Sequence, residues 1–99
     1  MTAISRVTAR ADPNTAEAHE FLGNLLSAKG QRDRAIEQFR EAVRIEPDFA
    51  RANLDLGAAL ADSGNSAAAM PHLRKAAQSG DTAVRDEALK LLDRLGGVP

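Results

Sequence analysis

The feature that most constrains this chain is an internal repeat of 34 residues. When the sequence is shifted by 34 positions, Leu22-Gly23 aligns with Leu56-Gly57, Gly30 aligns with Gly64, and nine positions of residues 16–49 become identical to their counterparts in residues 50–83. Alanine is common enough to supply some matches by chance, but the glycines and the large apolar positions are not. A unit of this length cannot bury its apolar face alone, so the chain is expected to fold by stacking one unit on the next.

Each unit has the pattern of two helices separated by a glycine. In the first unit, Leu22 and Leu26 lie on one face of a helix, and Gly30 ends it at a position that suits a left-handed residue. A second helix follows, with Ile36 and Phe39 on its apolar face. The second unit repeats this pattern. The sequence predicts helices and no strand, with the helices over residues 2–11, 15–29, 32–46, 49–62, 66–79 and 82–95.

Small and polar residues mark the contacts and the ends of these helices. Gly23 and Gly57 are predicted to lie where the two helices of a unit meet, because close packing requires modest side chains. Leu22, Leu26 and Phe39 are expected to fill the volume beside Gly23. Asn14, Asp48 and Asp81 stand before predicted helices, and short side chains with an oxygen atom favour the N-cap position. We therefore expect these three residues to cap helices, and we attribute Asp12, Asp48 and Asp81 to capping or turn formation rather than to a carboxylate site.

The composition excludes several classes of protein. The chain has no cysteine, which removes disulfides, zinc–thiolate sites and cysteine nucleophiles together. Its formal net charge is −1, so no overall field attracts nucleic acid or an anionic membrane. No stretch approaches the ~18 apolar residues of a transmembrane helix. We interpret the chain as soluble and favour the cytoplasm as its compartment.

The repeated residues carry a family resemblance that covers residues 16–81. The two units share a leucine–glycine pair, a later leucine and glycine, and a second helix with two alanines flanking a large apolar residue: Leu22, Gly23, Leu26, Gly30, Ala35, Phe39 and Ala42, then Leu56, Gly57, Leu60, Gly64, Ala69, Leu73 and Ala76. This pattern, followed in the first unit by Pro47, resembles the tetratricopeptide repeat. The resemblance implies an all-α fold, a right-handed α-α superhelix (solenoid) of helix-turn-helix repeats. His19 and Asn53 depart from it, because the family packs a large residue there.

The repeat also divides the chain. We predict a single domain over residues 1–99, with repeat one at 16–49, repeat two at 50–83 and a C-terminal capping helix at 82–95. Residues 1–12 are predicted to be either a partial repeat or an N-terminal helix, and we favour a chain cut from a longer array. Such a cut exposes an apolar end face, so weak self-association through the N-terminal end is expected.

The resemblance also implies a binding surface. In the family, one face of each first helix lines a concave groove that holds a segment of a partner protein. The corresponding residues here are Glu17, Glu20, Asn24, Ser27, Arg51, Leu54, Ala58, Ala61, Asp86 and Leu89. Solvated helix faces have the same pattern, and that alternative stays open. If the groove is real, its acidic residues favour a basic partner, with Leu54 as an apolar contact.

The leading hypothesis is therefore a protein–protein interaction scaffold that binds a peptide or helix in this groove. The alternatives are a structural or self-associating slice of a longer repeat protein and, ranked lower, an RNA-binding helical repeat, which would need a basic groove. The chaperone-binding subtype does not fit, because Glu20 and Asp55 lie where an acidic tail would bind. No nucleophile–base pair is visible, so we predict no enzymatic activity, no cofactor and no metal.

Overall fold

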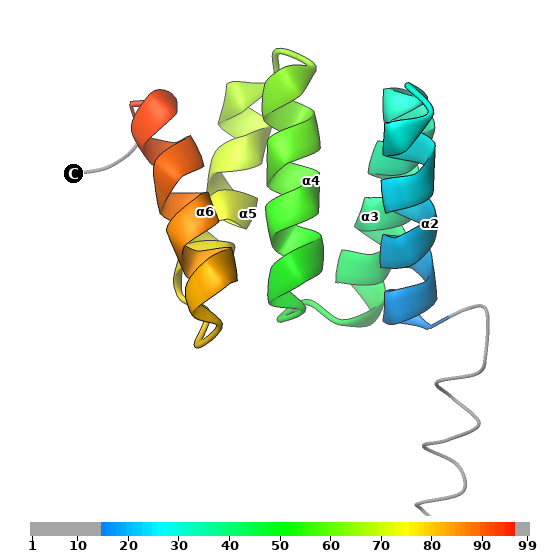
Figure 1. The fold of residues 1–99 in the computed structure, drawn as a ribbon, viewed down its shortest axis with the longest axis horizontal. Helices are drawn as coiled ribbons and strands as arrows, with labels where there is room; N and C mark the ends of the chain where they lie inside the picture. The colour runs from blue at the N-terminus through cyan, green and yellow to red at the C-terminus, as the bar shows by residue number, and fades with distance from the viewer. Residues whose placement is uncertain (1–14, 97–99) are drawn as a thin grey trace, which may run out of the picture.

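The computed structural model describes residues 15–96, and this part of the chain is built from five α-helices without a strand. The helices are α2 (Ala16–Ala28), α3 (Arg32–Ile45), α4 (Ala50–Asp62), α5 (Ser66–Ala77) and α6 (Thr82–Arg94). They form two layers, with α2, α4 and α6 toward the viewer in Figure 1 and α3 and α5 behind them. Consecutive helices pack against each other, and α4 also contacts both α2 and α6.

This arrangement confirms the all-α helical repeat. Each helix observed begins and ends within two residues of the predicted position. The right-handed superhelical turn and the division into repeats and a capping helix stay predictions. The helix expected over residues 2–11 lies outside the described residues.

Glycine ends the first helix of each unit, as the sequence predicts. Gly30 and Gly64 have φ values of 80° and 87°, in the left-handed region that glycine adopts without steric cost. The residue after each glycine donates a backbone hydrogen bond to the carbonyl of Leu26 or Leu60, at 2.9 and 2.8 Å. This closes the turn and sends the second helix back along the first.

The predicted N-caps are correct in one case of three. Asp81 caps α6, because its carboxylate accepts hydrogen bonds from the backbone amides of Ala83 and Val84. The cap of α2 is Thr15, which lies one residue after the expected Asn14. Asp48 does not cap α4, since Phe49 occupies the N-cap position without a side-chain hydrogen bond. Asp48 forms an exposed ion pair with Lys75 instead, at 3.3 Å.

The core runs between the two layers. Its largest fully buried apolar side chains are Phe39, Leu56 and Leu73, one from each of three successive helices. Gly23 and Gly57 are buried at the helix contacts, as predicted: a Cβ atom at Gly57 would lie 2.6 Å from Leu73. The expectation that Leu22 fills the core of the first unit is wrong, because this side chain is exposed.

The two residues that depart from the family pattern form hydrogen bonds at equivalent places. His19 Nδ1 donates to Gln38 Oε1 at 2.7 Å, and His72 Nδ1 donates to Asn53 Oδ1 at 3.0 Å. In both pairs the partners are 19 residues apart, so each bond joins the first helix of a unit to the second. The sequence suggested weakened packing here, but a polar contact replaces the apolar one in each unit.

Asn53 is completely buried and all of its polar atoms are satisfied. Its Nδ2 donates to the carbonyls of Pro47 and Phe49, both at 3.0 Å. This fixes the orientation of the amide, so its Oδ1 must accept and His72 Nδ1 must carry the proton. Burial, followed by the charges of Arg40 and Lys75, lowers the pKa of His72 and favours the neutral imidazole.

We expect Asn53→Ala to lower the free energy of unfolding by about 1–2 kcal/mol, because it leaves the carbonyl of Pro47 and His72 Nδ1 without this partner and removes one of the two hydrogen bonds to the carbonyl of Phe49. Denaturant unfolding followed by circular dichroism measures this change. Gln38→Ala is the matched control, since it breaks the equivalent bond of the first unit at a half-buried site. An equal or larger loss in the control would show that burial of Asn53 is not what makes the bond important.

Candidate functional site

The structure brings four of the predicted groove residues together where α2 passes α4. Asn24 and Ser27 of α2 and Ala58 of α4 line a shallow depression of about 120 Å³ between the two helices. Glu20 joins them through a hydrogen bond that Asn24 Nδ2 donates to its carboxylate at 2.5 Å. The predicted spacing therefore selects residues from separate repeats that lie side by side.

A carboxyl pair lies at the centre of this junction. Asp55 of α4 accepts a hydrogen bond from Asn24 Nδ2 at 3.3 Å, and its carboxyl group is also hydrogen-bonded to Glu20 of α2. Burial, followed by the hydrogen bond and charge of Glu20, raises the pKa of Asp55 to about 8 against the opposing influence of Asn24 and Arg51. Near neutral pH, Asp55 is therefore protonated and the pair carries one negative charge rather than two.

The other predicted groove residues lie outside this depression. Glu17 and Arg51 are exposed on α2 and α4, and Ala61 is half-buried. Asp86 and Leu89 are exposed on α6, the third helix of the same layer.

The expectation that Leu54 offers an apolar contact to a partner is wrong. Only 7% of its surface is exposed, and it belongs to the main core cluster. That cluster also contains buried residues of α3, α5 and α6. Leu89, which is 43% exposed, is the predicted groove residue that does present a large apolar surface.

Two residues of the junction were missed by the spacing used for the sequence prediction. Asp55 and Asp62 line the same depression, one residue beyond Leu54 and Ala61 in the sequence. The sequence does place Glu20 and Asp55 in adjacent units. From the sequence alone, this placement predicted only that the two residues would repel an acidic tail. Their hydrogen bond depends on how closely α2 approaches α4, which the repeat pattern does not encode.

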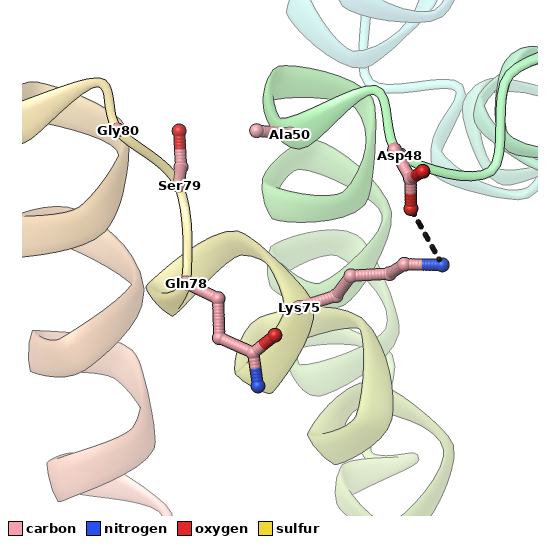
Figure 2. A pocket seen from close by; sticks show the side chains of 6 residues that line it. All are labelled: Asp48, Ala50, Lys75, Gln78, Ser79 and Gly80. Carbon is pink, nitrogen blue, oxygen red and sulfur yellow. Dashed lines mark ion pairs between the residues drawn. The ribbon is translucent and has the colours of Figure 1, made fainter.

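A second depression, of about 300 Å³, lies where the start of α4 faces the end of α5 and the loop before α6. Figure 2 shows Lys75 reaching toward Asp48 across its edge, while Gln78 and Ser79 form the other side. The Lys75–Asp48 ion pair is exposed, so it contributes little to stability. The side chains of this depression offer polar surface but no nucleophile–base pair.

Within residues 15–96, no group of three or more histidine and acidic side chains is arranged to hold a metal ion. None of the helices in the described part of the chain combines the length and the apolar character needed to cross a membrane.

Comparison with known proteins supports the family resemblance. Residues 23–64 match a family model described as TPR repeat, and this match spans all of α3 and α4 and the C-terminal part of α2. No curated protein matches the chain significantly. The match to the family model supports the resemblance to the tetratricopeptide repeat, a unit whose general role is protein–protein interaction and which is typically non-catalytic.

Proposed function

From this repeat we propose that the chain is an interaction scaffold that binds a segment of another protein on the layer formed by α2, α4 and α6. The observation that supports this most directly is the junction of α2 with α4, where polar side chains from two repeats line one depression. A partner segment that crosses the junction contacts both repeats at once.

The charges of this layer favour a basic segment. Glu17, Glu20 and Asp86 are negative, while Arg51 of α4 is positive and Arg85 Nε lies 3.9 Å from the carboxylate of Asp86. Asp55 adds a second negative charge to the junction only when it loses its proton. Leu89 on α6 supplies the exposed apolar contact. In such an interface the apolar contact contributes most of the binding energy, while the charges govern the association rate and selectivity.

The test is a peptide-array screen followed by titrations with the best basic peptide. Glu17→Lys combined with Glu20→Lys should weaken binding, and the loss should shrink at high salt because salt screens exposed charges. Leu89→Ala should weaken binding at every salt concentration. Affinity for the wild-type chain should also rise as the pH rises through about 8, since ionised Asp55 attracts the basic segment more strongly.

A matched control places the same charge change on the other layer. Asp33→Lys combined with Glu46→Lys alters two exposed acidic residues in and just after α3. If this variant loses as much affinity as the α2 variant, the effect is one of net charge and the proposed surface is wrong. A consistent preference for acidic peptides would contradict the proposal directly.

A further inference from the structure

The helix α2 also presents an apolar face that is separate from the α2–α4 junction. Phe21, Leu22 and Leu25 are 64%, 42% and 45% exposed, and they account for three of the five exposed large hydrophobic residues of the described chain. We call Phe21, Leu22 and Leu25 the α2 end face. Exposed apolar residues gathered on one helix are a common mark of an interaction surface.

The repeat shows what kind of surface this is. Shifted by 34 residues, Leu22 corresponds to Leu56 and Leu25 to Ala59, which are only 1% and 9% exposed. The same positions are therefore buried in the second unit and exposed in the first. The α2 end face is the counterpart of a face that this protein already covers at α4.

The helix of the first unit whose buried residues share a core cluster with this face of α4 is α3. The two helices pack against each other, and Ile36 and Phe39 of α3 share one core cluster with Leu56 of α4. These α3 residues are spaced three apart, so they form one apolar stripe on an amphipathic helix. The interface between α3 and α4 thus supplies a template for what fits on α2.

A depression of about 350 Å³ extends this surface between α2 and α3. Leu22 and Leu26 line it together with Arg34, Glu37 and Gln38 of α3. In the second unit, Arg34 and Glu37 correspond to Ala68 and Pro71. The depression of the first unit therefore has both an apolar part and a charged rim, whereas its counterpart has uncharged residues at those two positions.

We propose that the α2 end face and this depression bind the apolar stripe of an amphipathic helix of the α3 type, the second helix of another repeat. The helix would lie on α2 as α3 lies on α4, with its apolar side chains over Leu22 and Leu25. This surface is separate from the α2–α4 junction, and the two can be occupied at the same time.

A peptide with the sequence of residues 31–47 tests this proposal, because it carries the complete α3 stripe. It is added at up to millimolar concentration, since an isolated helix of this length is only marginally stable. In ¹⁵N NMR spectra of the whole chain, we expect saturable shifts for the amides of Phe21, Leu22 and Leu25. A peptide with Phe39→Asp should leave these amides unchanged.

Substitutions in the protein locate the interface. Leu22→Glu combined with Leu25→Glu should weaken peptide binding by roughly tenfold or more. Ala67→Glu is the matched control, because it places the same charge on an exposed apolar residue of α5, away from α2, and should leave binding unchanged. All three residues are exposed, so the variants should retain the wild-type circular dichroism spectrum and melting temperature.

Three results would overturn the proposal. The first is an absence of shifts on α2 at millimolar peptide. The second is a shift pattern centred on α4 and α5, which would mean that the peptide displaces α3 instead of binding to α2. The third is a stable dimer in sedimentation that the Leu22→Glu, Leu25→Glu variant abolishes, which would assign the face to a second copy of the chain.

Discussion

Gly57→Leu is expected to lower the free energy of unfolding by about 3 kcal/mol, the upper part of the range for overpacked cores. A Cβ atom at this position would lie 2.6 Å from Leu73 Cδ2 and 3.3 Å from the carbonyl oxygen of Ala69. The leucine side chain can shift, but the backbone of α5 stands behind it. The two helices of the second unit must therefore separate, which exposes part of the core.

Thermal and urea unfolding measure this effect. For a domain of this size, each kcal/mol corresponds to a fall of roughly 4–8 °C in the melting temperature. Gly57→Ala should give a smaller loss, since only Cβ is added. Gly80→Leu is the matched control, because a Cβ atom at Gly80 meets no atom within 4 Å. A Gly57→Leu variant as stable as this control would place Gly57 away from the helix contact.

Local features of the sequence accounted for the helices. The ends at Gly30 and Gly64 depend on backbone conformation at a single residue, and the cap at Asp81 depends on a side chain two or three residues from the amides that it binds. Such short-range effects repeat with the sequence, so a shift of 34 residues was enough to locate them. The same shift located the helix contacts at Gly23 and Gly57.

The exposure of individual side chains depends on how the helices pack against one another, which the repeat pattern does not specify. Leu22 and Leu56 occupy the same place in the repeat, yet the first is exposed and the second buried, because only the second belongs to the core cluster that joins α3, α4, α5 and α6. The periodic pattern assigns both to the core. Leu54 shows the opposite error: its spacing suggested the groove, but contacts with neighbouring helices bury it. Periodicity defines a face of a helix, whereas packing decides whether that face meets solvent.

The polar pairs could not be read from the sequence for a similar reason. Asn53 and His72 are 19 residues apart and become neighbours only when the helices of a unit pack together. Their counterparts in the first unit, His19 and Gln38, have exchanged the position of the imidazole. Both units therefore have a hydrogen bond between a histidine and a side-chain amide, but the residue types are exchanged between the two helices. A search for identical residues in the two units does not find this contact.

Asp55→Asn is expected to raise the free energy of unfolding at pH 8–9 by about 2–3 kcal/mol. Burial and the nearby Glu20 raise the pKa of Asp55 to about 8 in the folded chain, whereas an unfolded chain has the ordinary value of 3.8. The folded state therefore binds this proton more tightly, and its stabilising effect is complete below pH 3.8. It is lost as the pH rises from there through about 8. The expected value is roughly half of what the full pKa difference implies, because Asp55 retains contact with solvent.

Asparagine is the appropriate replacement because it resembles the protonated carboxyl group. Its amide can donate to Glu20, and its carbonyl can accept from Asn24, so both contacts of the α2–α4 junction are kept without a second charge. Asp93→Asn, at an exposed site on α6, removes one charge without touching the junction and should leave the pH dependence unchanged.

The measurement is urea unfolding of the wild-type chain and both variants from pH 4 to 9, supported by a ¹³C NMR titration of the Asp55 carboxyl group. The lowered pKa of His72 makes the folded chain less stable as the pH falls below 6.5, but it is common to all three proteins and cancels in their differences. The gain from Asp55→Asn should therefore grow steadily with pH and level off above about 8. A gain that does not vary with pH, or an Asp55 carboxyl group that titrates near 4, would mean that the two repeats do not hold a shared proton between α2 and α4.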